Sequence, residues 1–262
     1  MKPARQTGMR SLAIAAVVAL GLGLPGGALG TPSTTFWAPS TPSIQPYGVL
    51  HLTYDTYFQR GAEYPVDVGL EIGALRSTKL QLETGFDLLY PTVSSDGPLN
   101  FPVLLNAKVG APEDAWFKGS PAWSAGLFGV GFQSDVTNYD VLHAMLGKTV
   151  PRVGALSVGA YYGLTPALLR SSEGEERRGG IMAGWTSLPL DVPAIDHLQF
   201  AWDVQTGKNV LGAVGGGAYL YLTPAIDLLV GPVYFLDQRL QPGGSRWMWS
   251  VQFDADVNLL AP

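Results

Sequence analysis

The stretch Val66–Gly73 reads VDVGLEIG and alternates between apolar residues and polar residues or glycine. The run Lys79–Leu88, which reads KLQLETGFDL, repeats this alternation. Successive side chains of a β-strand point to opposite faces, so each run predicts a strand with one apolar and one polar face. Runs of about ten residues with this character, separated by turn-forming residues, recur roughly twelve times between Gly48 and Leu260. The sequence therefore predicts an all-β fold.

The predicted strands are Gly48–Phe58, Val66–Gly73, Lys79–Leu88, Asn100–Val109, Ala122–Phe132, Tyr139–Lys148, Val153–Leu164, Gly180–Leu188, His197–Gln205, Asn209–Leu222, Ala225–Leu236 and Trp247–Asn258. The fifth to eighth are rich in glycine and alanine and alternate poorly. Gly215–Gly217 predicts a kink or a close approach to the backbone. Because the connections Ala111–Pro121 and Pro189–Asp196 are long, counts of ten to fourteen strands stay open.

The N-terminus has the three parts of a secretory signal peptide. Lys2, Arg5 and Arg10 precede the apolar run Ser11–Leu24, and small residues follow up to Gly30. The apolar run is shorter than the roughly 20 residues that a membrane-spanning helix needs. We expect residues 1–30 to be cleaved as a signal peptide, with the cut after Gly30.

Composition excludes several classes of function. Removal of residues 1–30 leaves 13 basic and 21 acidic residues, a net charge of −8, which argues against nucleic acid as a partner. The chain has no cysteine, which excludes disulfides, thiol catalysis, cysteine-ligated metals and a lipid-modified N-terminal cysteine. Charged residues make up 14%, whereas a soluble domain has about a quarter.

With an export signal and repeated strands of this kind, residues 48–262 resemble the bacterial outer-membrane β-barrel class, without pointing to one family within it. The resemblance implies a transmembrane, antiparallel, up-and-down barrel of about twelve strands, with lipid outside and a polar lumen. It implies the outer membrane of a Gram-negative bacterium, with membrane lipid and the barrel-assembly machinery as partners. With an even strand number, the chain is expected to enter and leave the barrel on the periplasmic side. One departure is the C-terminus, Leu259–Pro262, which lacks the usual final aromatic residue and leaves the register of the last strand open.

Residues 31–47 are rich in proline, serine and threonine and carry Phe36 and Trp37. They lack periodicity and predict an extended leader before the first strand. Two alternatives stay open for this leader. It forms a periplasmic tail, or it folds into the lumen with Phe36 and Trp37 as anchors.

The polar faces of the first three strands and the last are the most strongly charged. Hairpin closure predicts His51 opposite Glu71 and Asp55 opposite Asp67. The next hairpin predicts Glu71 opposite Gln81 or Lys79. Barrel closure brings the last strand beside the first, so one shared wall of the lumen is expected to hold Asp55, Asp67, Glu83, Asp87, Asp254 and Asp256. The residues expected to line the lumen are Asp55, Asp67, Glu71, Glu83, Asp87, Asp254, Asp256, His51 and Lys79.

Three interpretations of these acidic lumen residues stay open. Their charges are paired with Lys79, Lys108 or loop arginines, or they favour cations in the lumen, or their carboxylates hold Ca²⁺. No recognised loop spacing frames a metal site, and neither a metal nor another cofactor is expected.

Catalysis is not expected. The histidines His51, His143 and His197 lack the His-x-Ser pair of outer-membrane phospholipases and lipid A deacylases, and Asp196-His197 is a single acid–histidine pair. The leading hypothesis is a passive, porin-like channel for small solutes or cations with an acidic, cation-favouring lumen. The alternatives are a plugged structural or interaction barrel without transport, and a soluble ligand-binding β-barrel.

Overall fold

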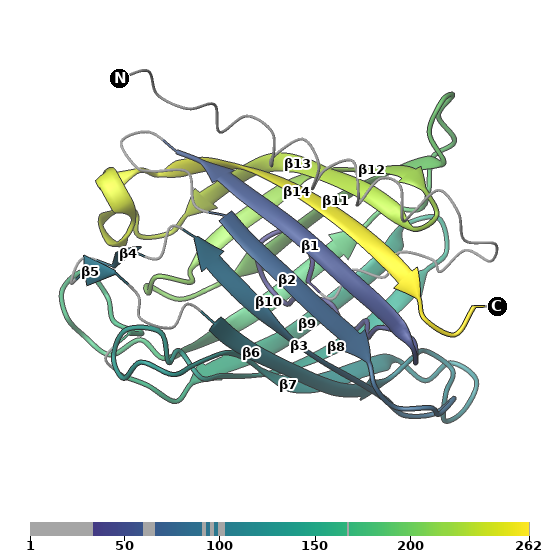
Figure 1. The fold of residues 1–262 in the computed structure, drawn as a ribbon, viewed down its shortest axis with the longest axis horizontal. Coiled ribbons are helices and arrows are strands. Elements are labelled where there is room, and N and C mark those ends of the chain that lie inside the picture. Colours follow the sequence, from purple (N-terminus) through teal and green to yellow (C-terminus); the bar gives the residue numbers. More distant parts are fainter. Residues whose placement is uncertain are drawn as a thin grey trace, which may run out of the picture.

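The computed structural model describes residues 34–59, 66–90, 93–94, 97–98, 103–166 and 168–261. In this part of the chain, twelve antiparallel strands close into one barrel (Figure 1). The strands of the barrel are β1 (Val49–Phe58), β2 (Val66–Gly73), β3 (Gln81–Tyr90), β6 (Val103–Ala111), β7 (Ala122–Gly131), β8 (Val141–Val150), β9 (Gly154–Gly163), β10 (Gly179–Thr186), β11 (His197–Gln205), β12 (Ala213–Thr223), β13 (Ile226–Phe235) and β14 (Trp247–Asn258). Each pairs with its neighbours along the chain, and β14 closes on β1. The predicted up-and-down barrel of twelve strands is confirmed.

The remaining elements lie in connections at one end of the barrel. Between β3 and β6, the short strands β4 (Val93–Ser94) and β5 (Gly97–Pro98) pair with each other. Between β13 and β14 lie the single-turn helices η1 (Gln238–Leu240) and η2 (Pro242–Gly244). No helix in the described part of the chain is long and apolar enough to cross a membrane. We call this end, where β1 continues to β2, the loop end, and the opposite end, where β1 begins and β14 finishes, the terminal end.

Most strand boundaries agree with the alternation, and the largest difference has a local cause. The tenth predicted strand starts at Asn209, whereas β12 begins at Ala213. Gly207 has a φ of 122°, a conformation that ends an extended strand. The side-chain oxygen of Asn209 also accepts the backbone N–H of Leu211 at 3.0 Å, which holds residues 206–212 as a connection. The predicted start of the fourth strand, Asn100, lies outside the described residues.

The last strand has a regular register despite its unusual end. It pairs with β1 from Val49 opposite Asn258 to Phe58 opposite Trp249 without a bulge. The chain then leaves the barrel at Leu259. Closure of the barrel between β14 and β1 is therefore regular.

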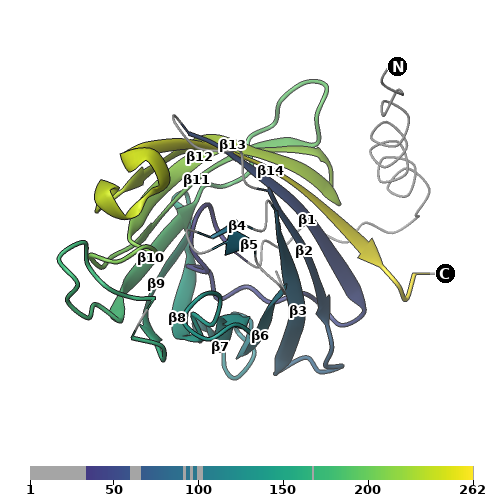
Figure 2. The same ribbon diagram turned by 60° about the vertical axis from the view of Figure 1, so that its left-hand side comes forward.

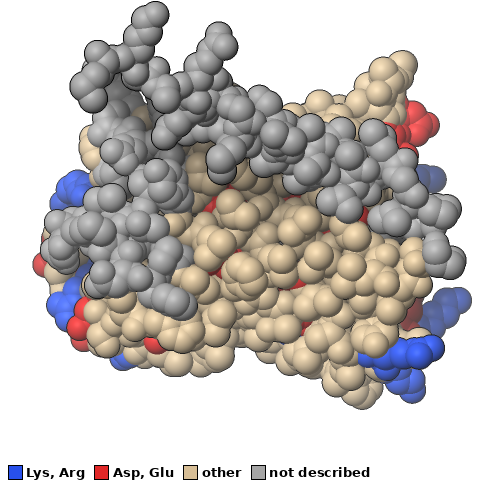
Figure 3. All heavy atoms as spheres, in the orientation of Figure 1, with Lys and Arg blue, Asp and Glu red and all other residues tan. Residues whose placement is uncertain are grey.

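The outer surface of the barrel is apolar across its middle. In Figure 3, Lys and Arg gather toward the two ends, while the visible part of the wall between them is almost entirely uncharged. The exposed apolar side chains of the strands include Leu82, Leu105, Leu142, Leu146, Val158, Ile181, Phe200 and Val214. The aromatic residues Tyr54, Phe58, Trp202, Trp247 and Trp249 are also exposed on the outside. This is the arrangement of a wall surrounded by lipid.

Inside, residues 34–46 follow the inner wall of the barrel. Figure 2 shows this purple segment within the ring of strands. Phe36 is 1% exposed, and its backbone carbonyl accepts a hydrogen bond from Gln252 Nε2 of β14 at 2.9 Å. Of the two alternatives for the leader, the structure shows the one in which the leader folds into the lumen. Residues 31–33 lie outside the described part of the chain.

Candidate functional site

The first hairpin arranges acidic residues as the alternation predicts. His51 lies opposite Glu71 and Asp55 opposite Asp67, which confirms both predicted pairs. These positions share one face with Gly69 and Gly73, and this face points into the barrel, while Leu70 and its neighbours point outward. The inner face of β1 and β2 is therefore an acidic strip.

The register of the second hairpin differs from the prediction. Glu71 pairs with Gly85, whereas Gln81 or Lys79 was expected opposite it. The cause is a longer turn over residues 74–80, in which Ser77 Oγ accepts the backbone N–H groups of Lys79 and Leu80 at 3.2 Å. Lys79 is exposed in this turn, so its predicted place on the lumen wall is wrong.

The acidic residues also fall into two groups, although one shared wall was expected. Asp254 and Asp256 of β14 lie beside β1, near the terminal end, where His51 Nδ1 is 2.7 Å from Asp256 Oδ1. Asp227 of β13 pairs with Asp254 across the strands. These side chains are buried and do not line the large cavity of the lumen.

The second group faces that cavity, which has a volume of about 450 Å³. We call its acidic side, formed by Asp55, Asp67, Glu71, Glu83 and Asp87, the acidic wall. The other sides are mostly apolar and include Phe36, Trp37, Leu104, Phe128, Tyr139, Leu211, Phe235 and Met248. The leader thus forms part of the boundary of the cavity.

Part of the acidic wall is paired within the protein. Glu83 lies 3.3 Å from Lys108 Nζ and accepts the backbone N–H of Gln45 at 2.7 Å. Asp87 accepts a hydrogen bond from Asn106 Nδ2 at 2.6 Å, and Asp55 accepts one from the Tyr57 hydroxyl at 3.3 Å. The first of the three interpretations, pairing with Lys108, therefore holds for Glu83.

Three carboxylate oxygens of the same wall have no hydrogen-bond partner among the described residues: Asp55 Oδ1, Asp67 Oδ1 and Glu71 Oε2. His143 also lines the cavity, and neither of its ring nitrogens has a hydrogen-bond partner among the described residues. The centroid of its ring lies 5.5 Å from that of the Phe128 ring. Within the described residues, no group of three or more His, Asp or Glu side chains is arranged to hold a metal ion. Unpaired carboxylates in a confined space favour positive charge at this wall.

Asp203 of β11, which the sequence analysis did not select, fixes the leader in the lumen. This residue is 0% exposed, and its Oδ2 accepts the backbone N–H groups of Phe36, Trp37 and Ala38 at 2.7, 2.7 and 2.9 Å. Tyr219 adds a hydrogen bond from its hydroxyl to the Thr35 carbonyl at 3.0 Å. A buried carboxylate that binds three backbone donors holds a segment in one conformation.

Inward-facing glycines form the path that the leader follows. Gly73, Gly110, Gly147 and Gly184 recur every 37 residues and lie beside Pro46, Ile44, Pro42 and Ser40 respectively. A methyl group added at Gly147 would lie 2.6 Å from Pro42 Cγ. Under Phe36, Gly215 and Gly217 provide the predicted close approach. The fixed spacing of these glycines was the signal in the sequence that could have revealed the path.

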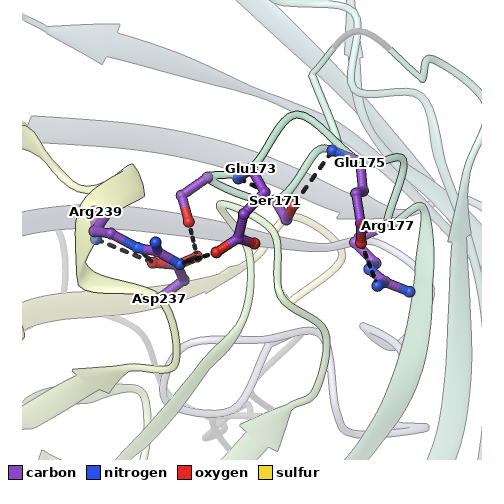
Figure 4. Close-up of polar contacts among 7 residues, drawn as sticks. Ser171, Glu173, Glu175, Arg177, Asp237 and Arg239 are labelled. Atoms are coloured by element: carbon purple, nitrogen blue, oxygen red, sulfur yellow. Dashed lines mark hydrogen bonds and ion pairs between the residues drawn. The ribbon is translucent and has the colours of Figure 1, made fainter.

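At the loop end, a charged cluster joins the β9–β10 connection to the β13–β14 connection (Figure 4). Asp237 Oδ2 accepts a hydrogen bond from Ser172 Oγ at 2.5 Å, and Arg239 Nη2 donates to Glu173 Oε1 at 2.6 Å. Arg239 Nε also donates to Asp237 Oδ1 at 3.1 Å. These contacts connect two loops that are far apart in sequence.

We expect this connection to open in acid. Withdrawal from water raises the pKa of Asp237, but hydrogen bonds from Ser172 and Arg239 outweigh it and bring the pKa to about 2. A carboxyl group with a folded pKa below its unfolded value stabilises the contact at higher pH and loses that effect as the pH falls from about 4 toward 2. Spin labels at Glu176→Cys and Gln238→Cys should give a narrow distance distribution at pH 6 and a broad one at pH 2.

In the Asp237→Asn variant the distribution should already be broad at pH 6. Labels at Leu146→Cys and Val158→Cys, opposite each other on β8 and β9, should stay unchanged and thereby show that the barrel is intact. An identical loop distribution at both pH values would contradict this role of Asp237.

The closed antiparallel barrel, its apolar outer surface and its polar lumen define the bacterial outer-membrane β-barrel class. No protein-family model and no curated protein matches the chain. Among solved structures, it is similar to an outer membrane channel from Pseudomonas putida F1, with 12% identity and a TM-score of 0.45 over 84% of this chain and 99% of that one. It is also similar to the NanC porin, with 10% identity and a TM-score of 0.45 over 78% and 98% of the two chains. At these identities the likeness concerns the fold alone.

Proposed function

We propose that this protein is a porin-like channel of the Gram-negative outer membrane that passes small solutes and favours cations. In this proposal residues 1–30 direct export, the barrel-assembly machinery inserts the chain, and lipid surrounds the apolar outer surface. The terminal end then faces the periplasm and the loop end faces outward, as is usual for bacterial barrels with an even strand number. In this proposal solutes pass through the lumen cavity, and the leader, which forms part of the boundary of that cavity, narrows the path.

The observation that carries this proposal is the acidic wall. Its oxygens Asp55 Oδ1, Asp67 Oδ1 and Glu71 Oε2 have no hydrogen-bond partner in the described residues and belong to residues that line the same cavity. Carboxylates along a pore attract cations and repel anions. Because the opposite sides of the cavity are mostly apolar, this wall sets the sign of the charge that the lumen accepts.

Single-channel recordings in a KCl gradient test the proposal. The wild-type protein should give discrete current steps with a cation-selective reversal potential. Asp67→Asn combined with Glu71→Gln should lower the ratio of cation to anion permeability severalfold, because two carboxylates of the acidic wall become neutral.

The matched control removes two charges away from the lumen, with Asp135→Asn and Asp191→Asn at exposed positions of connections. Heat-dependent migration in gel electrophoresis shows whether each variant is folded. Equal reversal potentials for the wild type and the lumen variant would refute the cation preference. A folded, inserted protein that carries no current would instead support a barrel closed by its leader.

A further inference from the structure

We infer that the lumen cavity binds an amphiphilic organic cation, an amine or quaternary ammonium attached to an apolar, aromatic body. The inference rests on the proposed function for access to the lumen and adds the chemical class of the solute. Three features of the cavity carry it: its size, its apolar sides and the unpaired oxygens of the acidic wall.

The size of the cavity suits a small organic molecule. Sites for such ligands have volumes of about 300–1,000 Å³ and combine apolar sides with a few polar groups. At about 450 Å³ the cavity lies in the lower half of this range. A single hydrated inorganic ion would leave most of the apolar lining without a partner.

Aromatic rings on the apolar sides are held in place. The Trp37 ring packs edge-on against Phe235, with ring centroids 5.4 Å apart, and against Tyr57 at 6.3 Å. Trp37 Nε1 donates to the Leu211 carbonyl at 2.8 Å, which fixes the orientation of the indole. Aromatic faces attract cations and stack with other rings, so the lining suits both parts of the ligand.

The acidic wall supplies the charge partner. Glu71 is 8% exposed, and its Oε2 has no hydrogen-bond partner in the described residues. Asp55 and Asp67 lie directly opposite each other on β1 and β2, so their negative charges repel. A cationic group between these residues would relieve this repulsion and the cost of confining unpaired charge.

Other ligand classes fit less well. An anion would face three carboxylates that each have one oxygen without a hydrogen-bond partner in the described residues. A neutral apolar molecule would displace water from these oxygens without replacing its hydrogen bonds. An ammonium group has donors for these oxygens, and its apolar body covers the rings. The cavity therefore distinguishes ligands by charge at one side and by shape at the other.

Calorimetric titration of the folded, full-length barrel in detergent tests the inference with three probes of similar shape: phenylbutylammonium, phenylbutanol and phenylbutanoate. We expect the ammonium to bind at least about tenfold more tightly than the alcohol, and the carboxylate not to bind. Asp67→Asn with Glu71→Gln should remove the preference for the ammonium. Phe128→Ala should weaken the ammonium and the alcohol by the same factor, whereas Phe117→Ala in an exposed turn should change neither.

The outcomes separate this inference from the proposed channel. Equal affinity for ammonium and alcohol, or an ammonium affinity unchanged in the acidic-wall variant, overturns the inference. Absence of binding by all three probes, with cation-selective currents retained, also overturns it and leaves the channel proposal standing. Tight binding of the ammonium that requires Asp67 and Glu71, by a barrel that carries no current, supports the inference and refutes the channel proposal.

Discussion

Leu146→Arg is expected to lower the fraction of barrel that assembles in the membrane. Leu146 lies in the middle of β8 and is 53% exposed on the outer surface. A charged side chain on the lipid face costs about 2–4 kcal/mol at the middle of the membrane and little near its edges. That cost is a large part of the net stability of about 5–15 kcal/mol that is typical of folded proteins.

The measurement is the folded fraction after refolding into lipid vesicles. Heat-dependent migration in gel electrophoresis detects this fraction. Phe117→Arg is the matched control, because it adds the same charge at an exposed position of the β6–β7 turn. We expect nearly normal folding of that control. Equal folding of both variants would mean that the outer surface of β8 does not face lipid.

Asp203→Ala is expected to release the leader from the lumen. The substitution removes the acceptor of three backbone N–H groups in a buried site. Each buried donor left without a partner costs about 1–3 kcal/mol, whereas a typical retained hydrogen bond contributes only about 0.5–1.5 kcal/mol. The retained bonds include those that Tyr219, Gln252 and Trp37 donate. The leader should then leave its path while the strands keep their pairing.

Two measurements follow the release. Protease should cut the variant within residues 34–46 while the barrel remains folded, and the single-channel conductance should rise because Phe36 and Trp37 no longer narrow the lumen. Asp191→Ala, at an exposed position of the β10–β11 connection, serves as the control. A conductance equal to that of the wild type, together with a protected leader, would show that Asp203 is not the anchor.

The alternation in the sequence predicted the barrel closely because one physical constraint acts on every strand. Lipid outside and a polar lumen inside impose a period of two, and β2 and β14 were predicted residue for residue. Turn lengths carry no such period. The turn after Gly73 was therefore misjudged, and with it the partner of Glu71 and the position of Lys79.

The candidate site was only partly predictable. Asp55, Asp67, Glu71, Glu83 and Asp87 could be assigned to the lumen from their strand positions. Their separation from Asp254 and Asp256 could not be predicted. It depends on where along the barrel axis the leader and the inward-facing side chains fill the lumen. The role of Asp203 was hidden for the same reason, since its partners lie about 165 residues away along the chain.

The glycine path relates the length of the leader to the number of strands. From Pro46 to Ile44, Pro42 and Ser40, the leader advances two residues for each hairpin of the wall, from Gly73 to Gly110, Gly147 and Gly184. Two extended residues span roughly 6.6 Å, while two strand spacings cover about 9.6 Å of the wall, as expected for a smaller circle inside a larger one. A relative of this protein with one hairpin more or fewer would therefore need a leader longer or shorter by two residues, so that insertions in the wall and in the leader must occur together.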